Sequence, residues 1–213
     1  MKRYKKDRGF IYAVVLLIMM PVFLFSISAV VNISNMNTFS NKDVSGAVST
    51  SCKDAAMQIN SIALAEGFVR INDANAHNRF RGTLASNLGL DINNNLQPLS
   101  NSAYVNKPRY WLLVYNGYAD YTGCSRAKLY YFDGSVVTSS DVSGVSGFPQ
   151  FFTITGSGIV AGSGSGRVVK LDTPGVIALV RIEGSRITGD IPLDISRWAC
   201  ARVVCNTGTC RAY

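Results

Sequence analysis

The chain is short of the residue types that carry out most catalysis and metal binding. It has a single histidine, and only 16% of its 213 residues are charged, compared with about 25% in typical soluble domains. One histidine excludes most histidine-based acid–base chemistry and most zinc sites. The hydrophobic fraction of 47% excludes a disordered tail protein. These features argue against an enzyme and favour a chain that presents a surface to lipid or to a partner.

Charge is missing altogether from one long segment. Residues 10–31, FIYAVVLLIMMPVFLFSISAVV, contain no charged side chain. As an α-helix this segment would be about 33 Å long, enough to cross a bilayer. A secretory signal has a shorter apolar region, and a buried core helix of this length normally has a polar face. The sequence therefore predicts a transmembrane helix over residues 10–31, kinked at Pro21.

The flanks of this segment predict its orientation. Five of the 21 lysines and arginines lie in residues 1–9, and the next basic residue is Lys42. Because basic residues stay on the cytoplasmic side of a span, we expect a basic cytoplasmic leader over residues 1–9 and an extracytoplasmic chain from Asn32 to Tyr213. The protein would then be a single-pass protein of the cell membrane. The other basic residues are scattered, so no nucleic-acid partner is expected.

All five cysteines fall in the part expected outside the cytoplasm, where disulfides persist. They are Cys52, Cys124, Cys200, Cys205 and Cys210. The odd number leaves the pairing open, although a disulfide-stapled tail over residues 198–213 is favoured. Neither a C-x-x-C pair nor a histidine partner is present, so no metal site is expected. For Cys52, the alternative to a disulfide is a small buried apolar side chain.

Two helices are expected after the apolar segment. Apolar residues recur every three or four positions from Val44 to Ile62, which predicts one face of a helix within a helical stalk over residues 32–66. The polar stretch before it has no proline or glycine, so we favour one continuous rod over two pieces joined by a hinge. The second helix has an N-cap at Asn72 or Asp73 and a C-cap at Gly89. His77 lies beside its apolar stripe, and a surface or capping role is expected for it.

The chain after Pro98 reads as β-structure. Runs of β-branched and aromatic residues begin at Arg109, Ala127, Phe151, Arg167 and Val176, and each closes on a glycine or aspartate turn. A strand rather than a helix follows the glycine-rich stretch 156–166, which therefore predicts a hairpin loop and not a nucleotide site. The fold class expected is α+β: a long N-terminal transmembrane helix, a short second helix, then an antiparallel β-sheet head over residues 67–213 with a Cys-rich tail.

No catalytic residue emerges from the sequence. Six aspartates lie mostly beside glycine, serine or proline, where a carboxylate usually caps a turn; they are Asp120, Asp133, Asp141, Asp172, Asp190 and Asp194. Two of them close in space could still act as an acid and a base. We expect no enzyme, and predict no catalytic, cofactor-binding or metal-binding residue and no cofactor.

The order of these segments resembles a known family. A basic leader ending in Asp7-Arg8-Gly9 precedes the charge-free helix with its internal Pro21. After it come AVSTSCKDAAMQIN, Arg70-Ile71-Asn72-Asp73, HNRFRGTLASNLGLD and an aromatic run ending in Asn116-Gly117. This arrangement resembles the TadE and TadG-like pseudopilins of the Tad (Flp) pilus and related type IV pilus systems, in the form associated with Gram-positive bacteria. The resemblance covers residues 1–117 and extends in weaker form to residues 176–180.

The resemblance implies a processing site and also a departure from the family pattern. Cleavage after Gly9 would make Phe10 the first residue and Val14 the fifth, where processed pilins typically have glutamate. The absence of that carboxylate favours a protein that stays in the bilayer over a polymerised major subunit. No family role is implied for the Cys-rich tail.

The sequence as a whole predicts a non-catalytic, membrane-anchored component of a pilus or secretion apparatus. Its N-terminal helix would pack against other membrane proteins of the machinery through small residues, namely Ala13, Ser26, Ser28 and Ala29. This packing would also allow homo- or hetero-oligomers. The alternative is a tethered adhesin or ligand-binding head with an aromatic contact face, formed by Tyr104, Tyr110, Trp111, Tyr115, Tyr118, Tyr121, Tyr130 and Tyr131. Aromatic residues at this density in strands more often form core and cross-strand pairs.

Overall fold

The computed structural model describes residues 4–100, 102–184, 193–206 and 209–213, without the side chains of residues 4–11, 29 and 31–42. In these ranges the chain is an α+β protein whose strands pair antiparallel. It divides into two compact units, Met1–Ser40 and Asn41–Tyr213. Helix α1, Tyr4–Ala56, contributes to both units.

The first unit consists of the N-terminal part of α1. Every described side chain from Tyr12 to Val30 is exposed, including Leu17 at 75% and Phe25 at 77%. Successive residues of a helix point about 100° apart, so these apolar side chains surround the helix on all sides. Pro21 lies inside the helix, and the Ser26 hydroxyl donates to the Val22 carbonyl oxygen at 2.8 Å.

The transmembrane part of the expected fold class is wrong. Across the residues that the structure describes, no helix combines the length and the apolar character that a membrane span requires.

The second unit begins with the C-terminal part of α1, which has one buried face. Val44, Val48, Cys52 and Ala55 are fully buried, at the spacing of three and four that the sequence predicts. The helix ends at Ala56, earlier than expected. The Asn60 side chain then caps a separate short helix, α2 (Ser61–Ala65), by accepting from the Ile62 and Ala63 amides.

Helix α3, Asp73–Leu88, confirms both predicted caps. The Asn72 side chain accepts a hydrogen bond from the Asn75 amide at the N-terminus. Gly89 ends the helix in the left-handed region with a φ of 63°, which glycine adopts at little cost. The buried stripe contains Ala76, Phe80, Leu84 and Leu88, together with His77.

The strands form three antiparallel sheets. The six-stranded sheet has the order β11-β10-β9-β3-β4-β5, a three-stranded sheet has the order β7-β6-β8, and β1 pairs with β2. The bounds are β1 Leu90–Asp91, β2 Gln97–Pro98, β3 Arg109–Tyr115, β4 Ala127–Phe132, β5 Val137–Asp141, β6 Gln150–Thr155, β7 Gly158–Ala161, β8 Arg167–Leu171, β9 Gly175–Gly184, β10 Leu193–Asn206 and β11 Thr209–Ala212. The runs predicted at β3, β4, β6, β8 and β9 are therefore strands.

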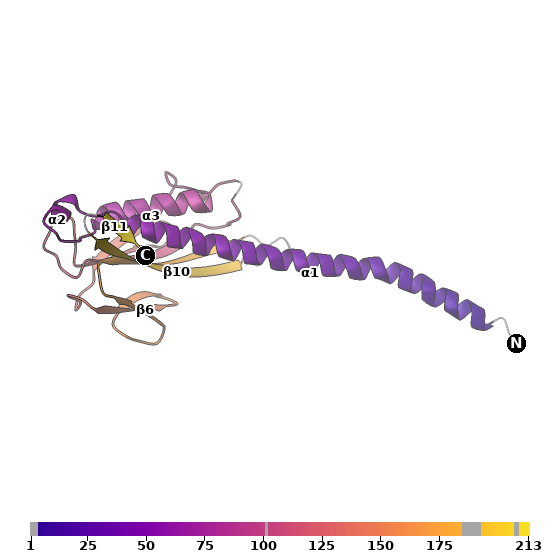
Figure 1. Ribbon diagram of the computed structural model, residues 1–213. Coiled ribbons are helices and arrows are strands. Elements are labelled where there is room, and N and C mark those ends of the chain that lie inside the picture. The colour runs from indigo at the N-terminus through magenta and orange to yellow at the C-terminus, as the bar shows by residue number, and fades with distance from the viewer. Residues whose placement is uncertain (1–3, 101, 185–192, 207–208) are drawn as a thin grey trace. The chain divides into compact units, whose positions relative to one another are not determined.

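The two faces of the six-stranded sheet are covered by different elements, as Figure 1 shows. In the central strand β3, Tyr110, Leu112 and Val114 pack into the core beneath α1 and α3. Leu113 and Tyr115 point the other way and pack against the three-stranded sheet, where the ring of Tyr115 lies 5.1 Å from that of Phe152. Alternate residues of one strand thus supply two separate hydrophobic cores.

Candidate functional site

A polar pocket of about 440 Å³ lies at one end of the six-stranded sheet. It collects the start of β3, the end of β9, the start of β10, the turn between β4 and β5, and a residue of β2. The lining residues are Gln97, Asn106, Lys107, Arg109, Asp133, Gly134, Ser135, Arg181, Ile182, Glu183 and Asp194. Its size is at the lower end of the range for small-molecule sites.

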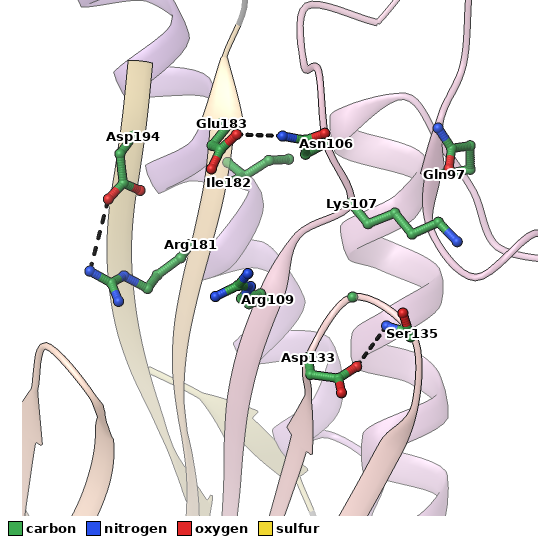
Figure 2. A pocket seen from close by; sticks show the side chains of 11 residues that line it. Gln97, Asn106, Lys107, Arg109, Asp133, Ser135, Arg181, Ile182, Glu183 and Asp194 are labelled. Atoms are coloured by element: carbon green, nitrogen blue, oxygen red, sulfur yellow. Dashed lines mark hydrogen bonds and ion pairs between the residues drawn. The ribbon is translucent and has the colours of Figure 1, made fainter. Parts of the chain in front are cut away.

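Two arginines from neighbouring strands line the pocket. Arg109 of β3 is directly opposite Arg181 of β9 in the antiparallel register. Residues in this relation project from the same face of the sheet with Cβ atoms about 4.5–5.5 Å apart, and like charges there repel. Figure 2 shows both side chains in the pocket, with the Arg181 guanidinium turned towards Asp194. Two neighbouring strands therefore bring together a pair of positive charges.

The arginine pair has weak counter-charges. Arg181 reaches the Asp194 carboxylate with an N–O distance of 3.9 Å, and its Nε atom is buried without a hydrogen-bond partner in the described part of the chain. Arg109 and Lys107 make no ion pair with any residue that the structure describes. A buried donor without an acceptor destabilises the fold. A ligand that accepts a hydrogen bond from Arg181 would remove this cost.

Two carboxylates of the pocket are engaged by neighbouring groups. Asp133 Oδ1 accepts from the Val136 and Ser135 amides at 2.8 and 2.7 Å, and these hydrogen bonds lower the pKa of Asp133. Glu183 accepts from the side-chain amide of Asn106. The hydrogen bonds of these two carboxylates therefore come from loop amide groups and not from the arginines.

The pocket is built for binding polar groups. Its lining contains no histidine, cysteine or lysine–carboxylate pair at hydrogen-bonding distance, and no cluster of potential metal ligands occurs within the described residues. Guanidinium groups bind planar oxyanions through paired hydrogen bonds. The arrangement can therefore recognise an anion or a polar ligand.

The predicted aspartates have different surroundings. Asp133 caps a turn as expected. Four others make ion pairs: Asp120 with Arg70, Asp141 with Lys128, Asp172 with Lys170 and Arg202, and Asp194 with Arg181. Asp190 lies outside the described residues. The structure thus brings Asp133 and Asp194 to the pocket, where sequence reasoning had assigned them no shared site.

His77 is not a surface residue, contrary to the expectation. Its side chain is buried beneath α3, where Nε2 is 2.8 Å from the Tyr110 hydroxyl and the ring stacks on Tyr130 at 4.2 Å. Burial, with a smaller effect of the Arg81 charge, lowers the pKa of His77 to about 4. The histidine is therefore neutral near neutral pH, in a buried cluster with two tyrosines.

The aromatic contact face does not form as one surface. Tyr104, Tyr110, Tyr115 and Tyr130 are buried. Trp111 and Tyr131 stack on each other at 4.9 Å across β3 and β4, whereas Tyr118 is exposed and lies 5.3 Å from the Arg70 guanidinium. Most of these rings lie in the core or pair across strands. They therefore do not form the aromatic contact face that the adhesin or ligand-binding alternative requires.

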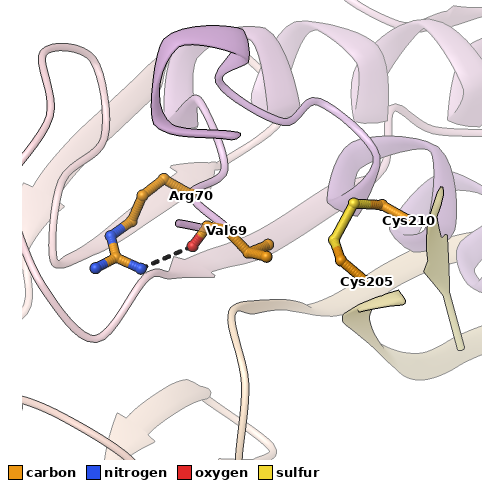
Figure 3. Close-up of a disulfide and its surroundings, with 4 residues drawn as sticks. All are labelled: Val69, Arg70, Cys205 and Cys210. Atoms are coloured by element: carbon orange, nitrogen blue, oxygen red, sulfur yellow. Dashed lines mark hydrogen bonds between the residues drawn. A yellow bond between two sulfur atoms is a disulfide. The ribbon is translucent and has the colours of Figure 1, made fainter. Parts of the chain in front are cut away.

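The cysteines divide into one pair and three free thiols. Cys205 and Cys210 face each other across β10 and β11 and form a disulfide (Figure 3). Cys52 and Cys124 are buried and free, and Cys200 is free and half-buried. Burial raises the pKa of Cys200 to about 11, which disfavours its reactive thiolate. The structure places one bridge in the tail, between Cys205 and Cys210, and it buries Cys52 as a free thiol.

The residues singled out in the N-terminal segment are not brought into any site. Ala13, Ser26 and Ser28 are exposed in α1, and the side chain of Ala29 lies outside the described residues. The side chain of Phe10, which follows Gly9 at the expected processing site, also lies outside them. Helix packing and processing stay predictions, as do the cell-membrane location and the pilus-machinery partners.

Comparison with known proteins assigns no family. No family model, curated protein or solved structure matches the chain. The resemblance to the TadE and TadG-like group therefore rests on the residues quoted for it.

Sequence reasoning missed the arginine pair and its neighbours Asn106 and Lys107. One signal was present: Arg109 opens one predicted strand, and Arg181 follows the apolar run of another. In antiparallel neighbours these positions fall at the same end. Only the pairing of β3 with β9 shows that they meet.

Proposed function

We propose that the chain is a non-catalytic, pseudopilin-like component of a Tad or type IV pilus or secretion apparatus. The apolar part of α1 packs against apolar helices of other subunits, and the unit Asn41–Tyr213 serves as an interaction head. The observation that carries this proposal is the exposure of the described apolar side chains from Tyr12 to Val30.

The described apolar side chains of residues 12–30 form a surface too large for a soluble monomer to leave exposed to water. Soluble monomers rarely expose large continuous apolar patches, and each Å² removed from water contributes about 25 cal/mol. Val15, Leu16, Leu17 and Ile18 are all more than half exposed although they point in different directions. A helix that is apolar all round needs neighbours on several sides, which a multi-subunit assembly provides.

The small residues of the same segment support close packing of helices. Ala13, Ser26 and Ser28 are exposed, and small side chains allow helix backbones to approach each other. The Ser26 hydroxyl is already bonded within its own helix, so packing against it does not leave an unpaired donor. This segment can therefore accept a neighbouring helix without a buried polar penalty at Ser26.

Complementation of a deletion strain tests the proposed function. We expect the strain to lose its surface filaments or its secreted products, and the wild-type chain to restore them. The double variant Leu17→Glu, Phe25→Glu should fail, because two charges would be buried at the helix contacts. Val136→Glu, at an exposed residue of the head, is the matched control and should restore function.

Two results would reject the proposal. One is a deletion strain with unchanged filaments and secretion. The other is full restoration by the double variant at wild-type protein levels, since the apolar surface would then not be needed.

A further inference from the structure

We propose that the pocket at the end of the six-stranded sheet binds a single carboxylate group, held between Arg109 and Arg181. This inference concerns the head alone and does not depend on the proposed pilus function. The carboxylate is a group of a small polar molecule or the acidic side chain of a partner protein.

The first argument is the register of the two arginines. Arg109 and Arg181 are cross-strand partners on one face of the sheet, and β3 and β9 are its two central strands. Repulsion between directly opposed like charges destabilises a strand pair. An anion between the guanidinium groups is attracted to both of them, and this attraction offsets the repulsion.

The second argument is the state of the donors. The Nε atom of Arg181 is buried without a partner within the described ranges, and its Nη2 atom is 3.9 Å from an oxygen of Asp194, which is an ion-pair contact and too long for a hydrogen bond. A guanidinium has five N–H donors in a planar fork. Carboxylate oxygens fit this fork through two parallel hydrogen bonds, so the ligand would satisfy donors that the described residues leave free.

The third argument selects a carboxylate over a phosphate. The pocket contains the cations of Lys107, Arg109 and Arg181, and also the carboxylates of Asp133, Glu183 and Asp194. The formal charges therefore balance, and a dianion would be repelled by three acidic groups. A monoanion gains the bidentate contacts with the smallest repulsion. The mainly polar lining also fits a polar ligand better than an apolar one.

Ligand-observed saturation-transfer NMR on the full-length chain tests the proposal. The probes are glucuronate, as a small polar carboxylate, and the amide-capped N-acetyl derivative of glutamate, as an acidic side chain. Their neutral controls are glucose and the corresponding glutamine derivative, and methyl phosphate is the dianion. We expect at least one carboxylate probe to bind and its neutral control not to bind. The tighter carboxylate probe identifies the source.

Variants locate the binding. Arg109→Gln and Arg181→Gln should each weaken the carboxylate probe by about tenfold or more. Arg126→Gln, at an exposed arginine outside the pocket, should bind like the wild type.

Four results would overturn the proposal. They are equal binding of the neutral controls, tighter binding of methyl phosphate, unchanged affinity in both pocket variants, and no binding of either carboxylate probe at about 10 mM, the range of weak single-group contacts.

Discussion

Helix α1 contains two apolar segments that have opposite surroundings. Val15 is 53% exposed and Leu17 is 75% exposed, whereas Val44 and Val48 are fully buried. The difference is one of pattern: the first segment is apolar in every direction, and the second is apolar at every third or fourth residue. A single buried face can be covered by one sheet, whereas an apolar surface on all sides needs several neighbours. The second segment therefore stabilises the head, and the first is the surface through which we propose that the chain assembles.

The largest effect on stability is expected in the buried segment. Val48→Asp would place a carboxylate where the side chain has no exposure. Burying an unpaired charge or forcing its neutralisation should lower the free energy of unfolding by about 4 kcal/mol or more. Urea unfolding followed by tryptophan fluorescence measures the change. A loss below about 1 kcal/mol, typical of surface positions, would mean that this segment is not part of the core.

The next effect is a loss of stability in acid caused by His77. The pKa of the folded His77 is about 4, and that of an unfolded histidine is about 6.5. Stability is therefore complete above pH 6.5 and falls as the pH approaches 4, because protons bind the unfolded chain more readily. The loss should be on the order of 2–3 kcal/mol.

Urea midpoints between pH 7 and 4.5 measure this dependence, with His77→Gln as the control. The variant keeps a polar group near Tyr110 and cannot become charged, so its stability should vary less over this range. Equal slopes for the two proteins would exclude His77 as the cause.

A smaller effect is expected from the disulfide of the C-terminal hairpin. Cys205→Ser removes a bridge that closes a short loop between β10 and β11, and short loops contribute about 2 kcal/mol. Non-reducing intact mass should show one bridge, about 2 Da lighter than the fully reduced chain. A mass about 4 Da below that of the fully reduced chain would show that two of the three free cysteines also pair.

Local signals allowed much of the head to be predicted. The N-cap Asn72 and C-cap Gly89 mark α3 because their chemistry depends on a few neighbouring residues. The runs at β3 and β9 are β-branched and aromatic, so the central strands were also recognisable. In contrast, β10 contains Asp194, Arg197 and two cysteines, and its sequence suggested a tail. Pairing with β9 over ten residues makes it a strand.

The remaining features depend on tertiary pairing. Neighbouring residues gave His77 no partner, since Tyr110 and Tyr130 reach it from other strands. Arg109 and Arg181 are separated by a large part of the chain and meet only through the β3–β9 register. The sequence therefore predicted the strands that form the site, but it did not predict that Arg109 and Arg181 meet there.

The smallest effect on unfolding, and the most direct test of the central claim, concerns Leu17. A photo-crosslinking amino acid at this exposed position should change the stability of the head by no more than about 0.5 kcal/mol. In the native host, irradiation should link residue 17 to helices of other subunits, identified by mass spectrometry, whereas the same group at Val136 should not form these products. Products at both positions alike, or at neither, would contradict assembly through the apolar segment of α1.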